Sequence, residues 1–288
     1  MSTAELIAAP PAPTSRPGAL RRQVGSELRL VFRRRRNVAL LVLICLIPVL
    51  IGIAVKVSTP HDGGGPAFLG QITGNGLFLA LTALTVCLPV FLPLAVAVVS
   101  GDSIAGEASY GTLRYLLALP VGRTRLLIVK AIGVLAYTAG LVAAIALVGL
   151  ITGAALFGLH NNVTLLSGDT VSLANGLARA GGIALYVVID LIGLAGVGLF
   201  FSTLTEVPVG AMAATIGFAI VSTVADAVPQ LGGIRGLLLT HHWLDFGDLM
   251  RTSVPIGTLV HNALLPLAYA AVFGAAAWSR MTTADVTS

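Results

Sequence analysis

The chain has 288 residues, of which 56% are hydrophobic and only 10% are charged. A soluble domain ordinarily carries about 25% charged residues, so this composition excludes a water-soluble globular protein and indicates one helical domain surrounded largely by lipid. The net charge of +5 does not indicate nucleic-acid binding, because basic residues cluster directly before the first long apolar run.

The N-terminal part contains a Pro- and Ala-rich stretch followed by a basic amphipathic segment. Residues 1–23 are predicted to form a disordered cytoplasmic tail because of that composition. Residues 24–37 are predicted to form an amphipathic interfacial helix on the inner leaflet. Its apolar positions share one face: Val24, Leu28, Val31 and Phe32. Arg33 to Arg36 then abut the first span, a position typical of a cytoplasmic anchor.

Six apolar segments are long enough to cross the hydrocarbon core, which requires about 20 residues. They are approximately Val38–Val57, Leu77–Ser100, Leu126–Phe157, Leu177–Ser202, Val207–Val228 and Ile256–Trp278, within a membrane domain of residues 38–280. With the N-terminus inside, all 17 basic residues except Lys56, Arg179, Arg235 and Arg251 are cytoplasmic. This bias places both termini, including the tail 281–288, in the cytoplasm.

The longest cytoplasmic loop is predicted between the second and third spans, over residues 101–125. Its first part, 101–120, is predicted to include a short helix beneath the bilayer that exposes charged residues to the cytoplasm. Glu107, Tyr110 and Arg114 lie near one face of this helix, and Arg123 follows in the same loop. Such a helix could transmit movement from a soluble partner. For Glu107, an ordinary solvated helix charge is the alternative interpretation.

A carboxylate occurs in the middle of the fourth span. Asp190 lies at a depth where an ionised carboxylate costs on the order of 3 kcal/mol, so it is expected to face the bundle interior or a wet cavity. It is a candidate translocation-path residue. A structural aspartate that is protonated or hydrogen-bonded is the alternative.

The outer segment 229–255 mixes leucines and aromatic residues with polar ones. It is predicted to form a short outer-face helix or a re-entrant hairpin, with Trp243 at the membrane interface. Potential metal ligands cluster here: His241, His242, Asp245 and Asp248. Adjacent histidines point in different directions on a helix and no HExxH spacing occurs, so an interfacial polar face is favoured and no metal is expected.

Several motifs together resemble a known family. The inner loop carries the pattern Glu107, Gly111-Thr112-Leu113-Arg114, Leu116-Leu117, Pro120, Arg123 and Lys130. This pattern resembles the ABC-2 family of exporter permeases, and Thr240 to Leu244 and the tail Asp285 to Ser288 are also similar to that family. The tail departs from the family pattern at Ala284, where a basic residue is common. With the six spans and the interfacial helix, the resemblance covers nearly the whole chain.

The resemblance implies an all-α membrane protein of the ABC-2 exporter type in the bacterial plasma (inner) membrane. It would pair with a second permease copy or a paralogue, with its path near spans two and five, and with cytoplasmic ABC ATPase subunits. Those subunits would hold ATP and Mg, and this chain would be no enzyme and hold no cofactor. A P-loop requires Gly-Lys, but both lysines, Lys56 and Lys130, follow valine.

Two other classes of function remain open at this point. A proton-coupled secondary transporter would use Asp190 and would need no ATPase. An intramembrane metal-dependent hydrolase would be built on His241, His242 and Asp245.

Overall fold

The computed structural model describes residues 19–58, 72–109, 111, 122–165 and 167–283. Six of its helices are long and apolar enough to cross a membrane, which confirms the predicted all-helical class with six spans. These helices are α2 (Arg35–Ser58), α5 (Phe91–Ser109), α7 (Arg123–Phe157), α8 (Leu173–Leu204), α9 (Pro208–Asp226) and α11 (Ile256–Thr283).

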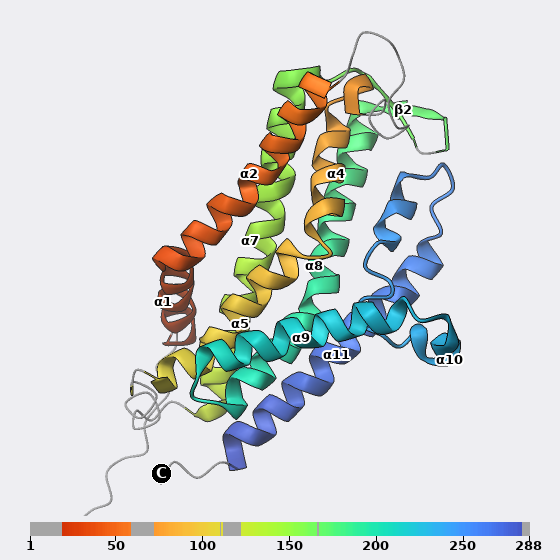
Figure 1. The fold of residues 1–288 in the computed structure, drawn as a ribbon. Coiled ribbons are helices and arrows are strands. Elements are labelled where there is room, and N and C mark those ends of the chain that lie inside the picture. The colour runs from red at the N-terminus through yellow and green to blue at the C-terminus, as the bar shows by residue number, and fades with distance from the viewer. Residues whose placement is uncertain (1–18, 59–71, 110, 112–121, 166, 284–288) are drawn as a thin grey trace, which may run out of the picture.

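The second predicted span is divided into two helices. Helix α4 (Leu77–Cys87) ends before a turn, and α5 starts at Phe91 with a new direction (Figure 1). Pro89 lies in the turn and Pro93 in the first turn of α5, and neither can donate a backbone hydrogen bond, which explains why the helix is broken here. Eight of the eleven residues of α4 are buried.

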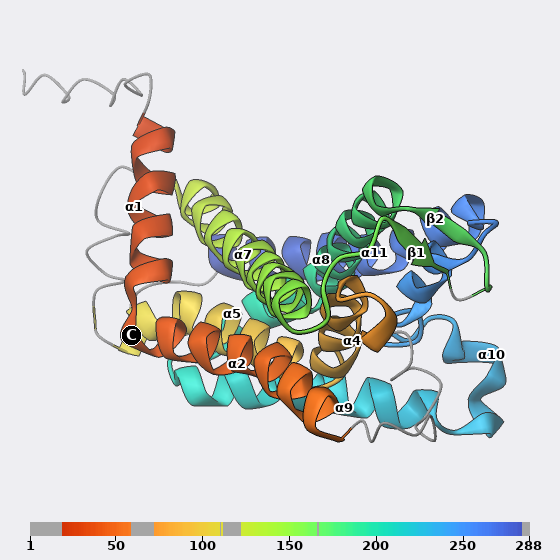
Figure 2. The same ribbon diagram turned by 90° about the horizontal axis from the view of Figure 1, so that it is seen from above.

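Helix α1 (Ala19–Arg33) lies across the direction of α2, and only Arg34 separates the two helices (Figure 2). It begins earlier than the predicted start at residue 24, because Ala19 to Gln23 are good helix formers that extend the amphipathic pattern. The rest of the predicted tail, residues 1–18, lies outside the described residues. The Phe32 and Tyr137 rings pack with centroids 5.6 Å apart and join α1 to α7.

Helix α8 occupies the centre of the bundle and packs against α5, α9 and α11, while α4 packs against α7. Small residues permit these close approaches. A Cβ atom at Gly149 would come within 2.7 Å of Ala80 Cα, and one at Gly196 within 2.8 Å of Ala270 Cα. By contrast, α2 and α9 expose most of their apolar side chains, as helices facing lipid do.

The outer connections form short elements at the end of the bundle opposite α1. A hairpin pairs β1 (Asn162–Thr164) with β2 (Thr170–Ser172), and residues 229–255 form η1 (Pro229–Leu231), α10 (Gly232–Arg235) and η2 (Asp245–Met250). These short helical turns take the place of the predicted outer helix or re-entrant hairpin. Trp243 is only 4% exposed, so its ring is covered by protein, and its position at the level of the membrane interface stays a prediction. The segment folds onto α8, which buries the ring inside the protein.

Candidate functional site

The candidate site lies at the end of α5 that is predicted to face the cytoplasm, which is called the inner end below. Residues 101–109, predicted to begin a separate surface helix, instead continue α5 without a break as far as Ser109. The predicted separate helix is wrong because the glycines in this stretch do not interrupt α5. Gly101 instead allows close packing, since a Cβ atom there would lie 2.8 Å from Met212 N of α9. Helix α5 therefore carries Glu107 as part of a rigid rod that extends from the bundle core.

Glu107 contacts a buried lysine rather than projecting into solvent. Lys130 of α7 donates to Glu107 Oε1 and, at 3.0 Å, to both carboxylate oxygens of Glu27 in α1. The exposed fractions of these side chains are 3% for Lys130, 12% for Glu27 and 13% for Glu107. In such surroundings the charges interact strongly, and each depends on the others for its burial. One ammonium group therefore joins α1, α5 and α7.

A second ionic group lies slightly deeper along α5. Asp102 is 8% exposed, and its carboxylate accepts a hydrogen bond from Arg34, between α1 and α2. It also forms an ion pair with Arg36, whose Nη2 lies 2.8 Å from Asp102 Oδ2. The arginine cluster that the sequence identified as a cytoplasmic anchor therefore also neutralises a buried carboxylate. Two carboxylates of α5 are thus held by cations from the neighbouring elements.

Helix α8 holds the same stretch of α5 through a serine. Ser202 Oγ donates to the Gly101 carbonyl at 2.7 Å and accepts from the backbone amides of Ile104, at 3.1 Å, and Ala105, at 2.9 Å. A hydroxyl that bonds to interior helix amides replaces part of the normal backbone ladder. The inner part of α5 is therefore fixed to the central helix by its backbone.

The other predicted contact residues are placed only in part. Arg123 starts α7 and donates to the carbonyls of Met281 at 2.9 Å and Thr282 at 3.2 Å, which fixes the inner end of α11. Positive charge at the last carbonyls of a helix is favourable. Tyr110 and Arg114 lie outside the described residues. The structure thus brings Glu107 together with Lys130, Glu27 and their neighbours, and it places Arg123 at a separate helix end.

Asp190 lies in the core, as the sequence predicts, with 1% of its surface exposed. Neither of its carboxylate oxygens receives a hydrogen bond from any described residue, and the same holds for the Tyr186 hydroxyl one turn away. The neighbouring wall is the outer segment. Its Leu249 side chain lies beside Gly182 and its Leu239 side chain beside Gly193. Tyr186 and Asp190 lie between these glycines on the same helix face, so they face the stretch between those leucines. Asp190 is therefore a buried polar group without a partner in the described part of the chain.

The histidines of the outer segment bind to different carboxylates. His241 Nδ1 lies 2.5 Å from Asp226 Oδ1, whereas His242 Nδ1 lies 2.7 Å from Asp245 Oδ2. Asn262 of α11 donates to that Asp245 oxygen at 2.7 Å. Within the described ranges, no three His, Cys, Asp or Glu residues are grouped so that they could hold a metal ion. These contacts fix the outer segment to α9 and α11.

The ionic groups around α5 were not predicted, because their members are far apart in sequence. Glu27 and Lys130 are separated by 103 positions, and Arg34 and Asp102 by 68. Two features of the sequence could have indicated the ionic group of Lys130. A lysine in an apolar span needs a buried partner, and Glu27 is an acidic residue in a strongly basic helix.

Comparisons with known proteins place the chain in a family. No curated protein matches it. A family model matches residues 38–239, which include the first five spans, Glu107, Lys130 and Asp190. The chain belongs to the family described as "Protein of unknown function (DUF2705)".

Proposed function

We propose that this multi-pass membrane protein is the transmembrane permease subunit of an ATP-driven exporter. It would form the substrate path and receive movement from a separate cytoplasmic ATPase through the 101–120 segment. The main support is the continuation of α5 to Ser109, which joins the core of the bundle to the loop that resembles the ABC-2 coupling loop. A continuous helix transmits a displacement from one end to the other.

The ionic contacts suggest how such a displacement would spread. Glu107 is connected through Lys130 to α7 and α1, and Asp102 is connected to Arg34 and Arg36 at the start of α2. Ser202 connects the same part of α5 to α8. A force applied by a partner at the end of α5 would therefore act on four other helices, α1, α2, α7 and α8, together.

A second permease copy would complete the path. Helix α9, which packs on α5, exposes a row of apolar side chains along its outer surface: Val209, Ile220, Val221 and Val224. In the proposal, two copies meet near α5 and α9 and enclose the substrate between them, as the family resemblance implies. ATP and Mg would bind only to the ATPase subunits.

The decisive experiment is purification of the full chain with an affinity tag from its native membrane in mild detergent. We expect a nucleotide-hydrolysing protein to co-purify in stoichiometric amounts and its ATPase activity to change when the permease is reconstituted with it. Transport by the reconstituted chain without any such companion would refute the proposal.

One observation favours a second candidate function. A buried carboxyl without a hydrogen-bonding partner is a suitable proton carrier, and Asp190 meets this description within the described residues. The chain would then be a proton-coupled secondary transporter. Substrate movement driven by a pH gradient, in vesicles containing this chain alone, would support this function over the ATP-driven one.

A further inference from the structure

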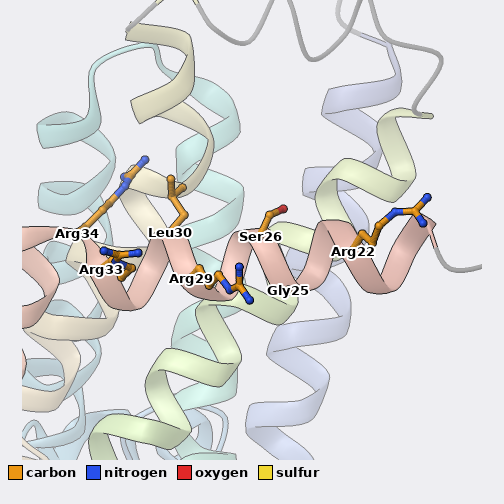
Figure 3. Close-up of a pocket in the computed structure, with 7 residues that line it drawn as sticks. All are labelled: Arg22, Gly25, Ser26, Arg29, Leu30, Arg33 and Arg34. Carbon is orange, nitrogen blue, oxygen red and sulfur yellow. The ribbon is translucent and has the colours of Figure 1, made fainter.

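A row of arginines follows one side of α1. Arg22, Arg29 and Arg33 are spaced by seven and four residues, so they repeat on one face of the helix, and Arg34 follows at its end (Figure 3). They line an open groove of about 640 Å³, and the space beside Gly25 is open because nothing lies within 4 Å of the position of its absent Cβ. Four guanidinium groups therefore line, along one side of α1, a space large enough for a phosphate-bearing headgroup.

The arginines of this row lack neutralising carboxylates. In the part of the chain that the structure describes, Arg22, Arg29 and Arg33 form no ion pair, and Arg34 alone is paired, with Asp102. The acidic residue of α1, Glu27, points the other way, toward Lys130. Uncompensated guanidinium groups bind phosphate oxygens well, because their planar donor pairs match the oxygen spacing.

The direction of Phe32 shows where the row lies relative to the bilayer. The Glu27 side chain of α1 lies beside Gly133 of α7, where an added Cβ would come within 2.9 Å of its Cγ, whereas the Phe32 ring lies beside Gly140, where an added Cβ would come within 3.0 Å of its Cζ. Seven helical residues correspond to about 10 Å along α7, so Phe32 points toward the membrane core. Arg29 is one turn from Phe32 on α1 and therefore lies beside the face that is turned toward lipid.

An apolar groove on α2 continues from the arginine row. This second groove, of about 510 Å³, has Arg33 and Arg35 at one end, and its remaining lining is aliphatic. The aliphatic residues repeat along one exposed face of the first span: Val38, Ala39, Val42, Leu43 and Leu46. Arg33 lines both grooves. A cationic groove thus leads into an aliphatic one, which suits a molecule with an anionic head and a hydrocarbon chain.

We propose that the junction of α1 and α2 is a binding site for an anionic phospholipid of the inner leaflet. Its phosphate binds Arg29 and Arg33, which are one helical turn apart, Arg22 adds positive charge further along the row, and one acyl chain lies along Val38 to Leu46. The aliphatic groove distinguishes this occupant from a soluble phosphate. A soluble phosphate would bind the arginines alone and would not need the aliphatic groove. The site does not depend on whether transport is driven by ATP or by protons.

Native mass spectrometry of the full chain, released from micelles containing equal amounts of phosphatidylglycerol and phosphatidylcholine, tests the proposal. Wild type should retain phosphatidylglycerol preferentially. Each arginine near an anionic surface contributes about a fivefold preference, so Arg22→Gln/Arg29→Gln should lower it on the order of tenfold or more. The control Arg251→Gln/Arg280→Gln removes the same charge from exposed positions outside both grooves and should leave the preference unchanged.

A neutral substitution separates the lipid from soluble anions. Ala39→Trp fills the aliphatic groove without changing charge, so it should reduce retention of long-chain phosphatidylglycerol while leaving binding of inorganic phosphate unaffected. Equal retention of both lipids by wild type would overturn the proposal. So would loss of preference in the control variant. If Ala39→Trp had no effect and millimolar inorganic phosphate displaced the lipid, the row would be a soluble-anion site and the lipid assignment would be refuted.

Discussion

Lys130 Nζ lies 3.0 Å from both carboxylate oxygens of Glu27, although 103 positions of the chain separate the two residues. The same nitrogen also donates to Glu107, so a single ammonium group serves two carboxylates. Because the Lys130 side chain is 3% exposed, water contributes little to its solvation. Helices α1, α5 and α7 are therefore interdependent at the inner end of the bundle.

Lys130→Met is expected to destabilise the protein strongly. The substitution leaves the Glu27 and Glu107 carboxylates close together and without their cation, and breaking a buried ion pair costs about 3–5 kcal/mol. The Tm of the purified protein in detergent should fall by roughly 10 °C. The additional change Glu27→Gln should recover part of the loss, since it removes one of the two stranded charges.

Lys56→Met is the matched control for that experiment. Lys56 is exposed and donates only to the Leu156 carbonyl, at 3.2 Å, among the contacts described. Its removal should change stability by no more than about 0.5 kcal/mol. If the two variants melted at the same temperature, the buried ammonium group would have no special role at the inner end.

Glu107→Gln should separate the role of Glu107 in coupling from its role in folding. The substitution keeps the shape of the side chain and one acceptor for Lys130, whereas Glu107→Arg would place a second cation beside Lys130 and disturb the fold. If Glu107 contacts the ATPase, the permease-dependent change in ATP hydrolysis should fall by about 5–150-fold, the range of typical coupling energies. Insertion and Tm should change far less.

Glu206→Gln provides the comparison for Glu107→Gln. Glu206 is an exposed carboxylate in the inner turn between α8 and α9, on the same side of the membrane. The Glu206→Gln variant should change ATP hydrolysis by the ATPase as much as wild type does. Equal coupling in both variants, measured in the same reconstituted complex, would remove Glu107 from the proposed contact.

The spans were predictable because hydropathy and length are local properties. The predicted segment Leu177–Ser202 lies inside α8, and Ile256–Trp278 starts where α11 starts. Lipid imposes a length of about 20 apolar residues on any crossing helix, and no tertiary contact is needed to recognise it. Basic residues such as Arg33 and Arg35 are local features too, and they mark the start of the first span.

The inner part of α5 was not predictable because its polar residues are satisfied by distant elements. Asp102 reads as the start of a polar loop, but in the structure it is buried and bonded to Arg34 and Arg36. Ser202 similarly compensates the backbone around Gly101. Hydropathy depends only on residue type, so it cannot indicate a partner that lies 68 positions away, as Arg34 does from Asp102, or 101 positions away, as Ser202 does from Gly101.

Gly153→Ala is expected to disturb the packing of α7 against the start of α4. A Cβ atom at Gly153 would overlap the Gly76 carbonyl, which is backbone and cannot rotate away. Overpacking of this kind costs about 1–3 kcal/mol, so the Tm should fall. Gly217→Ala in α9 is the control, since nothing lies within 4 Å of that position. It should leave the Tm unchanged or raise it, and a fall equal to that of Gly153→Ala would contradict the packing argument.

The orientation can be tested with single cysteines in a background in which Cys45 and Cys87 are replaced by alanine. Ser26 lies exposed on α1 and Ser253 lies exposed in the outer connection. With cytoplasmic termini, Ser253→Cys should react with an impermeant maleimide in intact cells, and Ser26→Cys only after permeabilisation. The reverse pattern would show that the positive-inside bias does not set the topology of this chain.

Asp190→Leu is expected to stabilise the protein and, if the carboxyl carries a proton during transport, to abolish transport. The Asp190 carboxylate receives no hydrogen bond from the described residues and is 1% exposed. Burying such a polar group costs about 1–3 kcal/mol, and an apolar side chain of similar size removes that cost.

Asp226→Leu is the control for this experiment. Asp226 accepts a hydrogen bond from Arg235 at 3.3 Å and contacts His241, so its loss should lower the Tm instead. The two Tm values and pH-gradient transport are measured on the same preparations. A lower Tm for Asp190→Leu would mean that the carboxyl has a stabilising partner in the native membrane, and a higher Tm with unchanged transport would exclude a proton-carrying role.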